Sequence, residues 1–115
     1  MRERPRDKSR LLHIMEACDI IANALARFGY EQILAEPLMY HGLVKHVEII
    51  GEAIYILSKE LKQDNPQIEW QAIEDLRHIL VHDYYRINPK MLRPIVEKDV
   101  PELRPMIQEI YDKES

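Results

Sequence analysis

The feature that most constrains the fold is an apolar stripe in the middle of the chain. Its members recur at steps of 4, 3, 4, 3 and 4 residues: Leu43, Val47, Ile50, Ile54, Leu57 and Leu61. This spacing places the side chains on one narrow face of an α-helix. We therefore predict one long helix from Leu38 to about Gln63, followed by a turn at Asp64-Asn65-Pro66.

The N-terminal third shows the same helical period. A first helix is predicted from Asp7, as its N-cap, to Phe28, with Gly29 as its stop. One extra turn over residues 30–34 precedes Pro37, which suits the first turn of the following helix. The apolar positions of the first helix are Leu11, Ile14, Met15, Cys18, Ile21, Ala22 and Leu25.

The last third, residues 90–112, is also predicted to be helical, as one helix or two. Pro94, Pro101 and Pro105 each remove a backbone donor, so a joint at residues 99–101 is more natural than one long rod. With a further helix near residues 68–85, the pattern predicts an all-α bundle of four to five helices.

Length and charge limit the function classes. The 115 residues fit a single domain, residues 1–115, and a second copy would help to bury apolar surface. Residues 1–6, with Arg2, Arg4 and Arg6, are predicted to form a flexible basic arm. The formal net charge of −4 argues against a broad basic surface, so any contact with nucleic acid must be local.

The remaining composition points to a cytoplasmic protein. The single cysteine, Cys18, has no internal partner and is predicted to pack in the core. No apolar run approaches the roughly 18 residues of a transmembrane helix, and no apolar signal stretch opens the chain. Three histidines are expected at the surface or at helix interfaces: His13, His41 and His46.

Candidate chemistry gathers on the predicted third helix, which runs from Ile68 or Trp70 to Tyr84 or Tyr85. Arg77 lies on the border between two faces, and its guanidinium could bind a phosphate while an imidazole transfers protons. RNA cleavage without a metal requires both functions, a cation that binds the phosphate and a group that transfers protons. The nucleophile itself can be the 2′-hydroxyl of the substrate. At 100° per residue, one face holds Ile73, Leu76, Leu80 and Tyr84, and the other holds Glu74, His78, Val81 and His82.

The spacing of these residues leaves other roles open. Arg77 could instead pair with Glu74 or Asp75, and His82 could stabilise a helix C-terminus. Glu74, His78 and His82 recur at every fourth residue, which is a workable spacing for metal ligands. Structural, catalytic and metal-binding roles therefore all remain possible from spacing alone.

The run from Arg77 to Tyr84 resembles the signature of the HepT-like branch of the HEPN superfamily: arginine, four residues, histidine, any residue, tyrosine. The resemblance extends over about Arg6 to Ile110, nearly the whole chain. The residues that carry it are Arg77-His78-Ile79-Leu80-Val81-His82-Asp83-Tyr84, Ile50-Gly51-Glu52-Ala53, Pro66 with Trp70, Tyr85, and Val100-Pro101-Glu102-Leu103.

This resemblance implies a HEPN-type helical bundle that dimerises, so that the motif of each subunit faces a shared cleft. It implies RNA cleavage without a metal or cofactor, with Arg77 and His82 as the catalytic residues. The residue after the arginine is often Asn or Asp in the superfamily and is His78 here. His78 could orient Arg77, assist proton transfer or line the cleft.

The resemblance also implies a partner and a control point. HepT-like proteins are typically toxins of type VII toxin–antitoxin systems, encoded beside an MntA-like minimal nucleotidyltransferase antitoxin. That antitoxin attaches AMP units to the motif tyrosine, here Tyr84, and the added charge beside the cleft would repel RNA. Two alternatives stand beside this one: a core-facing role for Tyr84, and a non-catalytic helical dimerisation module that binds a nucleotidyltransferase partner.

Overall fold

The computed structural model describes residues 4–75 and 89–114, and every regular element within these ranges is helical. This confirms the predicted all-α fold class for the described residues. The elements are α1 (Arg4–Phe28), α2 (Tyr30–Ala35), α3 (Pro37–Tyr55), α4 (Lys59–Asp64), a helix over residues 70–75, α6 (Pro89–Pro94), the π-helical segment η2 (Ile95–Asp99) and α7 (Val100–Lys113).

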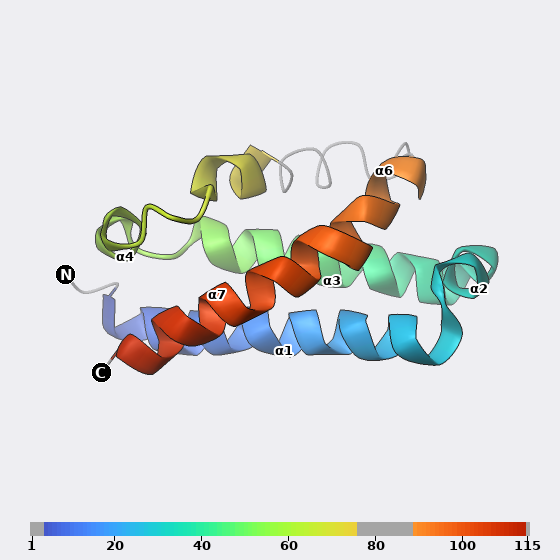
Figure 1. The fold of residues 1–115 in the computed structure, drawn as a ribbon, viewed down its shortest axis with the longest axis horizontal. Helices are drawn as coiled ribbons and strands as arrows, with labels where there is room; N and C mark the ends of the chain where they lie inside the picture. Colours follow the sequence, from blue (N-terminus) through green and yellow to red (C-terminus); the bar gives the residue numbers. More distant parts are fainter. Residues whose placement is uncertain (1–3, 76–88, 115) are drawn as a thin grey trace.

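Two long antiparallel helices, α1 and α3, form the base of the bundle, and α7 crosses them diagonally (Figure 1). α1 begins and α7 ends at the same end of the bundle, where Lys8 Nζ donates to the carbonyl of Glu114 at 3.1 Å. At the opposite end, α2 connects α1 to α3. The helix over residues 70–75 lies on the far side of α3 from α1 (Figure 1).

The connection between α1 and α3 has the helix boundaries that the sequence predicted. Gly29 adopts φ +77°, a conformation that is strained for residues with a Cβ, and its N–H donates to the carbonyl of Leu25 at 2.9 Å. α2 supplies the extra turn, and Pro37 opens α3 where no N–H is required. The predicted stop at Gly29 and start at Pro37 are confirmed.

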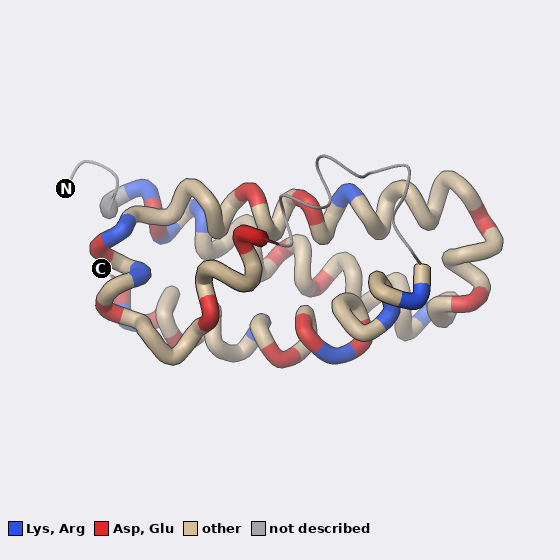
Figure 2. The backbone as a smooth tube through the Cα atoms, turned by 90° about the horizontal axis from the view of Figure 1, so that it is seen from above, with Lys and Arg blue, Asp and Glu red and all other residues tan. Residues whose placement is uncertain are grey.

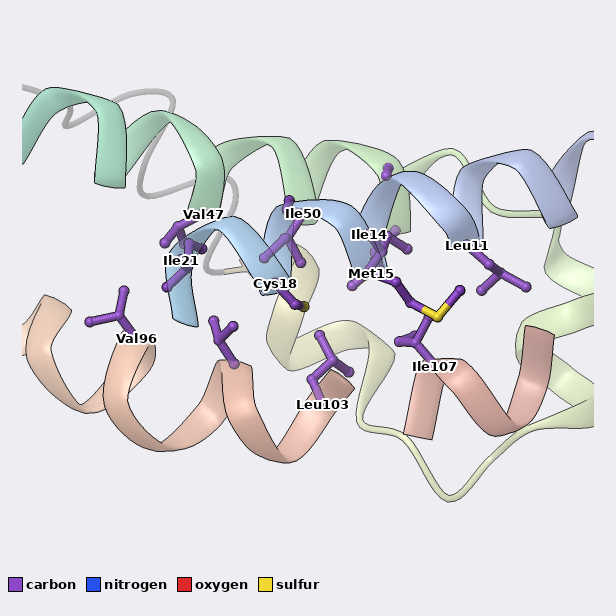
Figure 3. Packing of buried hydrophobic residues seen from close by; sticks show 14 of the residues in the cluster. Leu11, Ile14, Met15, Cys18, Ile21, Val47, Ile50, Val96, Leu103 and Ile107 are labelled. Carbon is purple, nitrogen blue, oxygen red and sulfur yellow. The ribbon is translucent and has the colours of Figure 1, made fainter. Parts of the chain in front are cut away.

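The apolar face of α1 is sandwiched between α3 and the C-terminal helices (Figure 3). Cys18 is 1% exposed at the centre of this face, which confirms its predicted core role. Burial, and secondarily the charge of Asp19, raises the pKa of the Cys18 thiol to about 12, so the group stays protonated. Ala22, which the helical period placed in the core, is exposed, and Ala17 is buried instead.

Asp7 does not cap α1, contrary to the prediction. α1 begins at Arg4, three residues before Asp7. Asp7 is fully buried, and its carboxylate accepts hydrogen bonds from the backbone N–H of Ser58, at 3.0 Å, and from the Ser58 hydroxyl. A buried carboxylate needs such donors, because an unpaired one would be strongly destabilising.

The predicted long helix from Leu38 to Gln63 is also corrected, because it is interrupted after Tyr55. Ser58 lies in extended backbone and caps α4 by accepting a hydrogen bond from Leu61 N–H at 3.2 Å. The Asp7 carboxylate therefore provides an acceptor for the Ser58 N–H at the point where the helix is interrupted. The six apolar residues of the stripe are nevertheless all buried, on both sides of the break.

The predicted joint near Pro101 is absent. α6, η2 and α7 follow one another without a break, and Asp99 and Val100 keep right-handed helical backbone angles. Pro101 lies in the first turn of α7, and the wider π-helical turn directly before it accommodates the missing donor. A continuous rod therefore replaces the predicted pair of helices.

Within residues 4–75 and 89–114, none of the helices combines the length and apolar character needed to cross a bilayer.

Candidate functional site

The four motif residues singled out above, Arg77, His78, His82 and Tyr84, lie outside the described residues. The structure describes the chain up to Asp75 and again from Pro89, on either side of the motif. Side-chain contacts hold both flanks to the bundle. We name these contacts the upstream clamp, formed by Lys62, Trp70 and Glu74, and the downstream clamp, formed by Tyr30, Pro89 and Arg93.

The upstream clamp centres on Lys62 of α4. The indole N–H of Trp70 donates to the carbonyls of Lys62, at 3.1 Å, and Asn65, at 2.9 Å. The Lys62 ammonium lies 2.6 Å from the Glu74 carboxylate and donates to the carbonyl of Tyr55 at 3.3 Å. Lys62 thus binds two residues that are one helical turn apart, Trp70 through its carbonyl and Glu74 through its ammonium.

The local sequence explains why α4 and the following helix meet in this way. Asn65 ends α4, and its side-chain amide donates to the carbonyl of Leu61 at 2.8 Å. The chain then reverses through the predicted turn, and Ile68 and Trp70 bury their side chains against the bundle. Burial of the indole ring supplies the apolar part of the contact, and its single N–H finds carbonyl partners as buried tryptophan requires.

Glu74 and Asp75, which the sequence offered as possible partners of Arg77, each contact another described residue. The Glu74 carboxylate is bound by Lys62, and both side chains are largely shielded, at 16% and 21% exposure. Neighbouring Asp75 accepts a hydrogen bond from the amide of Gln71 at 2.9 Å. Among the described residues, no three His, Cys, Asp or Glu side chains are grouped as metal ligands; His78 and His82 lie outside that part of the chain.

The downstream clamp ties the start of α6 to α2. The Tyr30 hydroxyl donates to the Pro89 carbonyl at 2.6 Å, and the Tyr30 side chain is only 4% exposed. Arg93 lies over the Tyr30 ring, 5.2 Å from its centroid, and pairs with Glu31 at 2.6 Å and Glu97 at 3.0 Å. Burial, followed by neighbouring Tyr40, raises the pKa of Tyr30, so the phenol remains a donor.

Arg93 itself is a solvent-facing member of this clamp. Its hydrogen bond to Glu97, followed by the charge of Glu97, raises the pKa of the guanidinium, so Arg93 stays positively charged. The side chains of Arg93, Glu31 and Glu97 are all exposed by 42% or more. Solvent therefore screens their attraction.

A cavity of about 440 Å³ lies beside the upstream clamp, between α3, the 70–75 helix and the η2–α7 rod. Its apolar lining includes Ile50, Ile73 and Leu103. Exposed carboxylates also line it, from Glu69, Asp99 and Glu102. These acidic groups disfavour an RNA phosphate, so the cavity is a poor candidate for substrate binding.

The three histidines outside the motif lie where the sequence predicted. His13 and His41 are exposed, and the His41 ring meets Tyr40 edge-on at 5.8 Å. His46 is half-buried, and its Nδ1 lies 2.7 Å from the carbonyl of Gly42.

Two residues of this frame, Lys62 and Tyr30, escaped the sequence analysis, and Asp7 behind it was assigned a capping role that it does not have. Lys62 and Glu74 are 12 positions apart across a turn, which matches no helical or strand spacing. Tyr30 and Pro89 are 59 positions apart. The only local signal was Trp70, because a buried indole always requires an acceptor for its N–H.

The described fold is an all-α bundle that holds both flanks of an Arg-x4-His-x-Tyr motif by side-chain contacts. Residues 14–110 match the family described as "Ribonuclease HepT-like". The chain therefore belongs to the HepT-like ribonuclease family of the HEPN superfamily, as its resemblance implied.

Two relatives that match most of the chain are named as ribonucleases. A "Putative RNase" of Caldanaerobacter subterraneus subsp. tengcongensis is 30% identical over 104 residues, covering 90% of this chain and 93% of that protein. A "Probable ribonuclease HepT" of Thermococcus cleftensis is 28% identical over 97 residues, covering 84% and 88% respectively. No solved structure matches the chain.

Proposed function

We propose that this protein is the toxin of a type VII HepT/MntA-like toxin–antitoxin pair and acts as a metal-independent RNA endonuclease. One observation carries the proposal: the Arg77–Tyr84 run has the Arg-x4-His-x-Tyr pattern and lies inside the residues that match the HepT-like ribonuclease family. The upstream and downstream clamps support it, because they anchor the chain shortly before Arg77 and shortly after Tyr84.

The proposed reaction uses the substrate's own nucleophile. His82 accepts the proton of a ribose 2′-hydroxyl, and the 2′-oxygen attacks the adjacent phosphorus while the bond to the 5′-oxygen breaks. The leaving 5′-oxygen takes up a proton, so the products are a 2′,3′-cyclic phosphate and a 5′-hydroxyl. Arg77 binds the phosphate oxygens through paired hydrogen bonds and stabilises the charge that builds on them.

The proposed assembly is a homodimer in which the two motifs face one cleft, silenced by an MntA-like nucleotidyltransferase. AMP units on Tyr84 add negative charge and bulk beside that cleft, which excludes RNA by repulsion and by occupation. The acidic net charge of the chain fits this local mode of control, since no broad basic surface would hold RNA elsewhere.

The test is cleavage of an end-labelled RNA by purified protein in EDTA. Wild type should cut, and Arg77→Ala and His82→Ala should each lose activity by about 100-fold or more. His13→Ala removes an exposed histidine outside the motif and should cut like wild type. An RNA whose 2′-hydroxyl is replaced by hydrogen at the cleavage site should resist cutting. An inactive wild type would instead favour the non-catalytic interaction module.

The control point has a separate test. With the neighbouring nucleotidyltransferase and ATP, the intact mass of the protein should rise in AMP-sized steps while RNA cleavage falls. Tyr84→Phe should abolish the mass change, whereas Tyr85→Phe, a matched change one residue along, should not. Labelling of Tyr84→Phe would reject Tyr84 as the acceptor.

A further inference from the structure

The α1–α3 pair has a second apolar face, on the side away from α7, which crosses the pair (Figure 1). On α1 this face consists of Ile20, Ala24 and Phe28, at steps of four residues. Ala24 lies about half a turn around the helix from Met15, whose sulfur contacts Arg104 of α7. Ile20 is 51% exposed and Phe28 is also exposed, so this row is open to solvent, in contrast to the core stripe of α1.

α3 completes the face with Leu38, Gly42 and His46, again at steps of four residues. Leu38 is 83% exposed, the highest value for a large hydrophobic side chain in the described part of the chain. Gly42 lies one helical turn further on, and a Cβ added there would meet nothing within 4 Å outside its own stretch of helix. A projecting side chain and an open space therefore lie next to each other. We name the two rows together the outer face.

A cavity of about 210 Å³ lies between the two rows of the outer face. Its lining joins residues of both rows to Met39 and to the core residues Ile21, Ile33 and Leu43. Among the described residues that line it, His46 has the only titratable side chain. A cavity of roughly 150 Å³ accommodates a benzene molecule, so this one has room for an aliphatic side chain.

The charge of the chain indicates what can cover this face. Charged residues make up 31% of the sequence, yet neither row contains Asp, Glu, Lys or Arg. Two copies of a chain with a net charge of −4 repel each other where acidic surfaces meet, but can approach through the outer face without facing carboxylates. At its border, the Arg27 guanidinium lies over the Phe28 ring, 5.1 Å from the centroid. An uncharged centre with a charged border is typical of protein interfaces.

The shape of the outer face favours a second copy as the occupant. Leu38 and the open space at Gly42 are one turn apart on the same helix, so a two-fold axis between them places each Leu38 against the cavity of the other copy. Such a contact uses the same patch on both subunits, as closed dimers do. The rows at steps of four residues are also the ridges that interlock in the commonest class of helix packing.

We propose that the outer face is a self-association surface, on which two copies of the chain pack their α1–α3 pairs together with Leu38 of each in the cavity of the other. The proposed function includes a homodimer, and this inference assigns a surface to it. It rests on that part of the proposed function alone, because self-association does not require RNA cleavage.

The test is the dimer dissociation constant of the full-length protein, measured by sedimentation equilibrium over a range of concentrations. Wild type should form a dimer. Leu38→Asp brings a carboxylate to the apolar cavity of the other copy and should raise the constant about 30-fold or more, as for an interface anchor. Because Leu38 lies in the first turn of α3, an acidic residue there is compatible with the helix. Met91→Asp, the matched change at an exposed apolar residue of α6, should leave the constant unchanged.

Gly42→Leu tests the cavity without adding charge. A Cβ has free space at this position, and leucine favours a helix more than glycine does, so the folded monomer should melt no earlier than wild type. The added side chain fills the space that Leu38 of the other copy requires, and should weaken the dimer about tenfold or more. Ala22→Leu adds the same kind of bulk at an exposed position of α1 outside the outer face and should not weaken it.

Two results would overturn the inference. A wild type that stays monomeric at every concentration would reject it together with the proposed homodimer, and would leave the outer face to a different protein. A dimer that persists in Gly42→Leu would reject the outer face alone and leave the homodimer to another surface, even if Leu38→Asp loses helix content by circular dichroism. RNA cleavage by wild type and by Arg77→Ala judges the nuclease separately, so the two proposals can fail independently.

Discussion

The upstream and downstream clamps fix the two flanks of the motif by different physical means. The upstream clamp combines a shielded ion pair with a two-acceptor indole, and its supporting helix is tied to a buried carboxylate in α1. The downstream clamp relies on one phenol-to-carbonyl hydrogen bond, surrounded by exposed ion pairs. Because water screens only the second set of charges strongly, the flank before Arg77 should be held more firmly than the flank after Tyr84.

Figure 2 marks the positions of Lys, Arg, Asp and Glu along the backbone of the bundle. Acidic positions lie at the end of the 70–75 helix, and a basic position lies near the start of α6. Substitutions that remove one contact at a time can show which clamp contributes more to the free energy of unfolding.

The largest effect is expected behind the upstream clamp, at Asp7. Asp7→Ala leaves the buried N–H and hydroxyl of Ser58 without their acceptor and should lower the free energy of unfolding by about 3 kcal/mol. Urea denaturation followed by circular dichroism measures this loss. Asp19→Ala, on the same helix but in a largely exposed pair with Arg104, should cost about 1 kcal/mol or less. Equal losses for the two aspartates would contradict the buried role of Asp7.

The next effect is expected at Trp70. Trp70→Phe keeps an aromatic ring but removes the N–H shared by the carbonyls of Lys62 and Asn65, and should cost about 1–2 kcal/mol. Protease cleavage within residues 56–75 should also become faster, since the turn would open more often. Unchanged unfolding and proteolysis would show that the indole hydrogen bonds do not support the upstream clamp.

A smaller effect is expected from the matched change in the downstream clamp. Tyr30→Phe removes one hydroxyl and leaves the ring under Arg93, so the loss should be about 1 kcal/mol. Urea midpoints of the two aromatic variants, measured side by side, test the proposed ranking. A larger loss for Tyr30→Phe than for Trp70→Phe would reverse it.

The smallest effect is expected at Arg93. Because its partners Glu31 and Glu97 are both exposed, Arg93→Ala should leave the urea midpoint nearly unchanged. Raising the salt concentration from about 0.05 M to about 0.5 M should remove any remaining difference from wild type, because added ions screen the attraction between exposed charges. A clear destabilisation that persists in high salt would show that the cation–π contact with Tyr30 contributes more than its exposure suggests.

Local chemistry made much of the fold predictable. Apolar periodicity located α1 and the buried stripe that runs from α3 into α4, and the backbone preferences of Gly29 and Pro37 marked the ends of the connection between α1 and α3 correctly. The interruption at Ser58 was missed, and the buried carboxylate that binds Ser58, Asp7, lies 51 positions away in the sequence. At Pro101 a break between two helices was predicted, but the rod is continuous because a π-helical turn precedes the proline.

The candidate site also has a part that the sequence predicted and a part that it did not. The motif itself was recognisable as a sequence pattern, and family membership is confirmed, whereas the roles of Arg77, His82 and Tyr84 remain predictions. The frame around it depends on pairings between separate elements. No periodicity links Lys62 to Glu74 or Tyr30 to Pro89, so only the folded structure reveals them.

The bond between Asp7 and Ser58 has a consequence for the order in which the molecule assembles. Closing a loop of 51 residues carries an entropy cost that must be met by contacts formed earlier, here the packing of α1 on α3. We therefore expect α4 to reach its final orientation only after these two helices have paired. A chain shortened from its N-terminus past Asp7 would keep every residue of the upstream clamp, yet would lose the contact that orients it.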